Sequence, residues 1–206
     1  MKFMCNFIKI STFVVLIMAP FLGFAHGQET VESGHVAVEN PATLSQSEAN
    51  KIYDEIRGRM ARGYELAGLS IIEKYQSWKR YNSAPYISAT HGQRFVNSYA
   101  NRRVKAYGNL SQGEKYPVGS VFAKDSLTVT DDNKIYPGAM FVMEKLATGT
   151  HPETADWRYV MILPDGTTFG DTTGTEAELV EYCHECHEAK AEDDYVFYVP
   201  EKFQIK

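Results

Sequence analysis

The most constraining feature of this chain is the run Cys183-His184-Glu185-Cys186-His187, which stands near its C-terminal end. In a Cys-x-x-Cys-His motif the two thiols lie one helical turn apart and can add to the two vinyl groups of a haem, and the histidine then lies below the iron. The motif therefore predicts one haem c per chain, attached covalently through Cys183 and Cys186, with His187 as an axial iron ligand.

Two other uses of the same residues are weaker. A structural zinc site takes four ligands, usually as two separated pairs, and the sequence has no second Cys pair. A redox-active thiol pair normally stands where a strand turns into a helix within a βαβ unit. Here residues 175–182 already have a helical pattern, so haem attachment is favoured over both alternatives.

The N-terminal segment has the pattern of a secretory signal peptide. Lysines precede an apolar run at residues 13–24, and small residues follow it at 23–27. The run is shorter than the ~20 residues that a membrane span needs, and no later stretch is long and apolar enough. We expect residues 1–27 to be cleaved and the protein to be periplasmic or secreted, with an uncleaved anchor as the alternative.

Charge and cysteine content limit the partners. Removing the two lysines of the signal changes the formal net charge from −5 to −7. An acidic surface argues against nucleic acid or an anionic membrane as partner, and it is compatible with docking to a redox partner protein. A homodimer is also compatible with the sequence. Only Cys183 and Cys186 would stay in the mature chain, so no disulfide framework is expected.

The pattern along the chain predicts one domain after a leader. Residues 28–44 are polar and aperiodic and indicate a flexible leader, and residues 45–206 form the expected haem domain. Ser45 and Glu48 make a capping box at the start of an amphipathic helix. A second apolar stripe at residues 71–78 predicts a second helix, or a continuation of the first beyond a break.

In the rest of the domain, segments rich in β-favouring residues are separated by turn signals, which predicts an antiparallel meander. Strands are expected at residues 94–99, 119–130, 138–146 and 157–163. A short helix capped by Asn101 is expected between the first two strands. A capping box of Thr175 and Glu178 predicts the start of the helix with the haem motif, and residues 194–203 predict a last strand. The expected fold class is α+β, with N-terminal helices packed on an antiparallel β-sheet and a C-terminal helix that carries the CxxCH haem motif.

The haem motif, the acidic and aromatic run after it at residues 188–197, and its position after β-rich sequence together resemble the cytochrome P-460 family. The resemblance extends back through Asp156-Trp157 to residues 91–100. It implies a haem that lies against an antiparallel sheet, with the other side of the iron open to ligands. It also implies oxidation of hydroxylamine with electrons passed to an acceptor, or nitric oxide binding without that chemistry, as in the related cytochrome c′-β proteins.

The resemblance gives Lys124 a special role. Residues 119–127 match the family pattern in which a strand lysine, followed by an acidic residue, is covalently joined to the haem edge. Alternation along the strand places Phe122 and Lys124 on one face and Ala123 and Leu127 on the other. The residues alone also allow a lysine that simply projects into water.

The resemblance further implies a distal carboxylate that takes protons from bound hydroxylamine. Glu144 fits this role, because it falls between Val142 and Leu146 on an apolar strand face where burial would raise its pKa. Acids that precede the haem motif are the alternatives, although acids in the first turns of a helix are explained by the helix dipole.

A six-coordinate iron is the remaining alternative. His91 could ligate the iron opposite His187, and so could the sulfur of Met140, Met143 or Met161. Such a protein would be an electron-transfer cytochrome without an open site. The methionines also fit the hydrophobic core.

Overall fold

The computed structural model describes residues 37–205, so the predicted signal peptide and most of the predicted leader lie outside the described residues. The α-helices of this part are α1 (Gln46–Glu65) and α2 (Glu181–His187). Its strands are β1 (Lys79–Arg80), β2 (Tyr86–Ser88), β3 (Arg94–Ala100), β4 (Val121–Val129), β5 (Ile135–Pro137), β6 (Met140–Lys145), β7 (Trp157–Ile162) and β8 (Thr168–Asp171). Its 3-10 turns are Ser70–Ile72, Tyr75–Ser77, Ala89–His91, Pro152–Thr154, Ala177–Val180, Glu188–Asp193 and Glu201–Phe203. Neither α-helix of residues 37–205 has the length and apolar character needed to cross a membrane.

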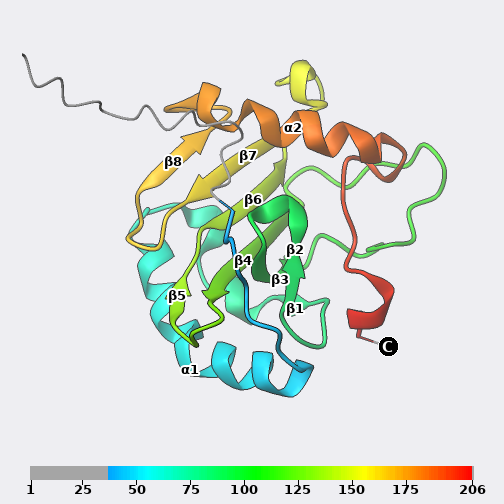
Figure 1. Ribbon diagram of the computed structural model, residues 1–206. Helices are drawn as coiled ribbons and strands as arrows, with labels where there is room; N and C mark the ends of the chain where they lie inside the picture. Colours follow the sequence, from blue (N-terminus) through cyan, green and yellow to red (C-terminus); the bar gives the residue numbers. More distant parts are fainter. Residues whose placement is uncertain (1–36, 206) are drawn as a thin grey trace, which may run out of the picture. The chain divides into compact units, whose positions relative to one another are not determined.

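The strands form one antiparallel sheet in the order β1-β3-β4-β6-β7-β8, with β2 paired to β3 and β5 paired to β4. Figure 1 traces the meander from β4 through β6 and β7 to β8. The four strands expected from alternation correspond to β3, β4, β6 and β7. The predicted α+β class with an antiparallel sheet is therefore confirmed.

Helix α1 begins where the capping box predicts. The Ser45 hydroxyl accepts a hydrogen bond from the Glu48 N–H at 3.3 Å, and the Glu48 carboxylate accepts one from the Ser45 N–H at 2.8 Å. The side chains that α1 buries share one helical stripe: Ala49, Tyr53, Ile56, Met60 and Tyr64. This stripe packs on one face of the sheet.

The predicted second N-terminal helix is wrong. The chain after α1 forms only short 3-10 turns, because Gly68 and Lys74 adopt left-handed backbone conformations with φ of 68° and 57°. The apolar stripe on which the prediction rested is nevertheless part of the core, and Ile72 and Tyr75 are buried against α1 and the sheet. The periodicity of residues 71–78 therefore predicted which side chains are buried, but it did not predict the backbone conformation.

Three smaller expectations also differ from the structure. Asn101 caps a turn, since its side chain accepts from the Arg103 N–H and donates to the Gly119 carbonyl. No capping box forms at Thr175, because Glu176 is left-handed with φ of 53° and a 3-10 turn follows. Residues 194–203 form a turn, a loop with buried Val196 and Val199, and the 3-10 turn Glu201–Phe203 instead of a strand.

The end of the predicted leader that the structure describes contacts the sheet. The Ala42 N–H donates to the Val129 carbonyl at 2.8 Å, and Pro41 forms a bridge with Thr130. Ala42 is buried in the core between α1 and the sheet. The chain is thus fixed to β4 a few residues before α1 begins.

The two faces of the sheet carry different cores. One face packs against α1 and contributes Val121, Ala123, Leu127 and Val129 of β4. The other face carries an aromatic cluster that includes Phe122, Trp157 and Tyr159. Helix α2 lies on this second face, and the space between them is the candidate site.

Candidate functional site

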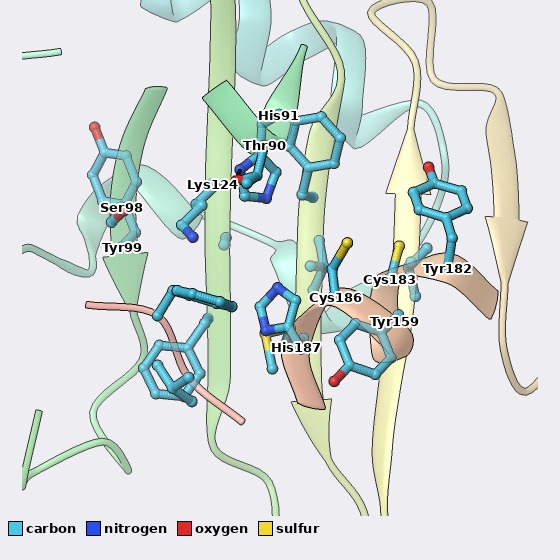
Figure 2. A pocket seen from close by; sticks show the side chains of 18 of the residues that line it. Thr90, His91, Ser98, Tyr99, Lys124, Tyr159, Tyr182, Cys183, Cys186 and His187 are labelled. Atoms are coloured by element: carbon cyan, nitrogen blue, oxygen red, sulfur yellow. Dashed lines mark hydrogen bonds between the residues drawn. The ribbon is translucent and has the colours of Figure 1, made fainter. Parts of the chain in front are cut away.

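A cavity of about 310 Å³ lies between the sheet and α2. Strands β3, β4, β6 and β7 form one wall, and α2 with residues 196–197 forms another. The lining side chains are mostly apolar or aromatic: Thr90, His91, Ser98, Tyr99, Tyr107, Phe122, Ala123, Lys124, Phe141, Val142, Met143, Tyr159, Val160, Tyr182, Cys183, Cys186, His187, Ala189, Val196 and Phe197. Figure 2 shows Cys183, Cys186, His187 and Lys124 around the same space.

The tautomer and the charge state of His187 suit it to bind a metal ion through Nε2. Its Nδ1 lies 2.6 Å from the Tyr195 carbonyl oxygen, so Nδ1 carries the proton and Nε2 keeps its lone pair. Burial, and then the nearby charge of Lys124, lower the pKa of His187 to about 4. The imidazole is therefore neutral at physiological pH, which is the form that binds a metal.

The two cysteines reach the cavity from consecutive turns of α2. Cys183 is half-buried and Cys186 is exposed, and both are free thiols that line the cavity. Burial raises the pKa of the Cys183 thiol to about 12. A catalytic thiol pair needs a lowered pKa, so this environment disfavours the redox-thiol alternative.

The zinc alternative has no support in the part of the chain that the structure describes. Within residues 37–205 no group of at least 3 His, Cys, Asp or Glu side chains is arranged to hold a metal ion. His91 and His151, the two described histidines outside the motif, do not complete such a group.

Lys124 lies on the cavity side of β4, as alternation predicts. Phe122, Ala123 and Lys124 line the cavity, and Ala123 and Leu127 belong to the core beneath α1. The Lys124 amine makes no hydrogen bond or ion pair with any residue that the structure describes. Burial lowers its pKa to about 8, because no neighbouring carboxylate compensates for the lost hydration.

Two of the possible sixth iron ligands, one histidine and one methionine, line the cavity. His91 lines it, and Ser88 Oγ lies 2.8 Å from its Nδ1. Met143 lines it too. Met140 is buried in the core beneath α1, and Met161 accepts a hydrogen bond from the Tyr182 hydroxyl at 3.7 Å without lining the cavity.

The structure does not bring Glu144 to the cavity. Glu144 does share a strand face with Val142, as expected, but that face is the one that packs towards α1. The Glu144 carboxylate accepts from Arg158 Nη1 at 3.0 Å, and Arg158 in turn binds Asp171. Among the described residues that line the cavity there is no aspartate or glutamate.

Sequence reasoning missed the carbonyl of Tyr195, which orients His187. A backbone acceptor has no side-chain pattern, so no sequence signal could have identified it. It also missed the aromatic wall of Tyr159 and Phe197, whose rings lie 5.5 and 5.2 Å from the His187 ring by centroid distance. The aromatic run after the motif was the available signal for Phe197.

These residues fit a haem. Two thiols and a neutral imidazole stand on one helix at the spacing that thioether attachment and axial ligation require. Apolar and aromatic walls match a flat, hydrophobic macrocycle. The Lys124 amine on the opposite wall has no partner within residues 37–205, and a native protein rarely leaves a buried polar group unpaired away from a functional site.

Comparison with known proteins agrees with this geometry. A search of the curated proteins finds no match to the chain. The family model described as Cytochrome P460 matches residues 72–198, which is more than half of the chain. The matched region runs from the turns before β1 to the segment after α2, and it includes every residue that lines the cavity. The chain therefore belongs to the cytochrome P460 family, and this membership implies a haem cofactor.

Proposed function

We propose that this protein is a mono-haem c-type cytochrome that oxidises hydroxylamine, or a closely related nitrogenous substrate, in the cavity between β4 and α2. Cys183 and Cys186 would hold the haem as thioethers, and His187 would ligate the iron. The observation that carries the proposal is the joint placement of these residues and of the Lys124 amine, which pairs with no described residue, around one apolar cavity. Residues 1–27 would direct export, so the protein would act in the periplasm or outside the cell and pass electrons to a redox partner protein.

The bound haem would supply the redox-active iron, and the chain's own residues would supply orientation and proton transfer. The hydrogen bond from His187 Nδ1 to the Tyr195 carbonyl fixes the ring and strengthens Nε2 as a ligand. Apolar walls exclude water from the site. Oxidation of hydroxylamine releases protons, and His91 is the cavity-lining imidazole that can accept them. We assign no such role to Glu144, which pairs with Arg158.

Lys124 would form the covalent link that the family resemblance implies, and its position in the cavity wall supports this role. Its lowered pKa leaves a substantial fraction of neutral amine near pH 8, and only the neutral amine is nucleophilic. In such a link the Lys124 nitrogen would bond to a carbon of the haem edge, each partner would lose one hydrogen as a proton, and two electrons would pass to an external two-electron oxidant. Phe122, on the same strand face, would pack beside it.

A second candidate is reversible nitric oxide binding without turnover. The described residues that line the cavity include no carboxylate, so proton removal from hydroxylamine would depend on His91, and this favours binding without turnover. A third candidate, electron transfer by a six-coordinate iron, is favoured by the presence of His91 and Met143 in the cavity wall.

One preparation separates these candidates. The full chain is expressed with haem-attachment machinery and purified, and its intact mass and absorption spectrum are recorded. We expect a mass that shows one covalent haem and loss of residues 1–27, and replacing Cys183 and Cys186 by serine should abolish attachment. A wild-type protein without covalent haem would overturn the proposal.

The spectrum and kinetics then distinguish the reactions. A Soret band that is shifted far to the red in the reduced protein and is lost in Lys124→Ala supports the linked, hydroxylamine-oxidising enzyme. Tight nitric oxide binding with no reduction of an added electron acceptor by hydroxylamine supports the gas-binding candidate. A low-spin spectrum that becomes high-spin in His91→Ala or Met143→Ala supports the six-coordinate cytochrome.

A further inference from the structure

A buried ion pair stands beside the cavity without lining it. Lys145, the last residue of β6, lies with its Nζ 2.8 Å from Asp194 Oδ1, and the two side chains are 5% and 1% exposed. Removing two charges from water costs several kcal/mol per ion, and their attraction compensates only with good geometry and further hydrogen bonds. A pair of this kind is weak evidence for a gain in stability, so its role is better sought in what it positions.

Both members of the pair are fixed by further contacts. Lys145 Nζ also donates to the Ala155 carbonyl at 3.1 Å and lies 4.6 Å from the centroid of the Trp157 ring. The second carboxylate oxygen of Asp194 accepts from the Tyr116 N–H at 2.8 Å. Asp194 is therefore anchored to the end of β6 through Lys145 and to the loop that precedes β4 through Tyr116.

Asp194 is the neighbour of the residue that orients His187. The Tyr195 carbonyl accepts the Nδ1 hydrogen bond of His187, and the Tyr195 N–H donates to the Lys190 carbonyl at 2.7 Å. Asp194 and Tyr195 are both left-handed, with φ of 50° and 67°. Successive left-handed residues other than glycine are unfavourable, so this turn persists only where other contacts hold it.

We propose that Lys145 and Asp194 are positioning residues that hold the Tyr195 carbonyl on His187 and thereby set the electron donation of this ligand to the iron. The inference rests on the proposed role of His187 as the axial ligand. A hydrogen bond from the second ring nitrogen raises the basicity of a ligating imidazole, and such bonds tune the potential of haem iron. The ion pair acts on the iron through the backbone, and neither charge contacts the cofactor cavity.

The test is the reduction potential of the haem-loaded double variant Lys145→Met/Asp194→Asn. This variant removes both charges together and leaves no unpaired ion, while methionine keeps the packing over Trp157. We expect the equilibrium constant between the oxidised and reduced haem to shift about tenfold towards the reduced form. For a one-electron couple this is an upward shift of the reduction potential by about 59 mV. The iron–histidine stretching frequency of the reduced protein should fall, because His187 becomes a weaker donor.

The matched control is Lys134→Met/Asp132→Asn, the same exchange at an exposed pair with 2.7 Å between Lys134 Nζ and Asp132 Oδ2. It should leave both readouts unchanged. A double variant that carries covalent haem but has the wild-type potential and stretching frequency would overturn the inference and leave the proposed haem site intact. A wild-type protein without haem would overturn both.

If the double variant fails to fold, the single variant Lys145→Arg provides the same test. Lys145→Arg keeps a cation opposite Asp194 and displaces the carboxylate by the larger head group. An upward shift of its potential, smaller than that of the double variant, supports the inference, and a wild-type potential contradicts it. A lower melting temperature alone, without a change in potential or spectrum, would show that the pair is only structural.

Discussion

Two neighbouring residues of β4, Lys124 and Asp125, are both deeply placed ionisable groups, but their surroundings differ completely. Asp125 faces α1 and is 0% exposed, and its carboxylate accepts hydrogen bonds from Tyr53 at 2.6 Å, Tyr75 at 2.8 Å and Asn97 at 3.1 Å. Lys124 faces the cavity, where no described side chain pairs with its amine. A buried charge with every partner in place holds a fold together, whereas one without partners indicates a site.

Removal of the Asp125 carboxylate is expected to have the largest effect on the stability of the fold. In Asp125→Ala the Tyr53 and Tyr75 hydroxyls and the Asn97 amide lose their acceptor, and each buried unsatisfied donor costs about 1–3 kcal/mol. We expect the free energy of unfolding to fall by about 4 kcal/mol, measured by circular dichroism in urea. The exposed Asp54 on α1 is the control, and Asp54→Ala should change the free energy by less than about 0.5 kcal/mol.

The sequence predicts local features of the two faces of β4 better than it predicts the partners of the buried groups on them. The capping box of Ser45 and Glu48 and the alternation of β4 are local patterns, so the sequence predicts them correctly. Tyr53 and Tyr75 are 72 and 50 residues from Asp125, and no local pattern connects them. Tertiary contacts decide such clusters, so the sequence could not predict them.

Glu144 shows the same limit for the candidate site. Alternation placed it correctly on a face with Val142, but alternation cannot tell which face of a sheet meets the cavity and which meets a helix. The haem motif needed no such information, because its chemistry depends on residues within one helical turn. The motif residues and Lys124 that the sequence singled out do line one cavity, and their roles in haem attachment stay predictions. The sequence did not single out most of the residues that surround them.

A second prediction concerns pH. Burial raises the pKa of Asp125 from 3.8 to about 6, against the opposing effect of its hydrogen bonds. Between these pH values the folded protein keeps a proton that the unfolded chain releases, so the stability falls as the pH rises through this window and then levels off. The loss is on the order of 3 kcal/mol.

The check is the difference in unfolding free energy between the wild type and Asp125→Asn, measured in urea from pH 4 to pH 6 at about half-unit steps. Subtraction removes the titration of groups that both proteins share. The wild type should lose stability relative to the variant as the pH rises. Parallel curves would mean that Asp125 does not hold its proton in the folded state.

A smaller effect is expected from Tyr75→Phe, which removes one of the donors to Asp125 and keeps the ring. A hydrogen bond to a charged group contributes about 1.5–3 kcal/mol, and Tyr53 and Asn97 still bind the carboxylate. We therefore expect a loss of about 1.5 kcal/mol in the same urea measurement. Tyr136, which is 51% exposed, is the matched control, and Tyr136→Phe should be neutral. Equal losses in the two variants would contradict the role of the Asp125 cluster.

The smallest change in stability is expected at Lys124, where the change in function is largest. Lys124→Met keeps the unbranched stem, leaves no donor or acceptor without its partner, and removes an amine whose pKa burial lowers to about 8. The free energy of unfolding of the haem-loaded protein should stay within about 1 kcal/mol of the wild type. Under the proposed function, the red-shifted Soret band and the turnover of hydroxylamine should be lost. The exposed Lys105 gives the control, because Lys105→Met should preserve stability, spectrum and turnover alike. A loss of stability at Lys124 as large as that in Asp125→Ala, with an unchanged spectrum, would show that both neighbours serve the fold and that the contrast between the two faces of β4 has no functional meaning.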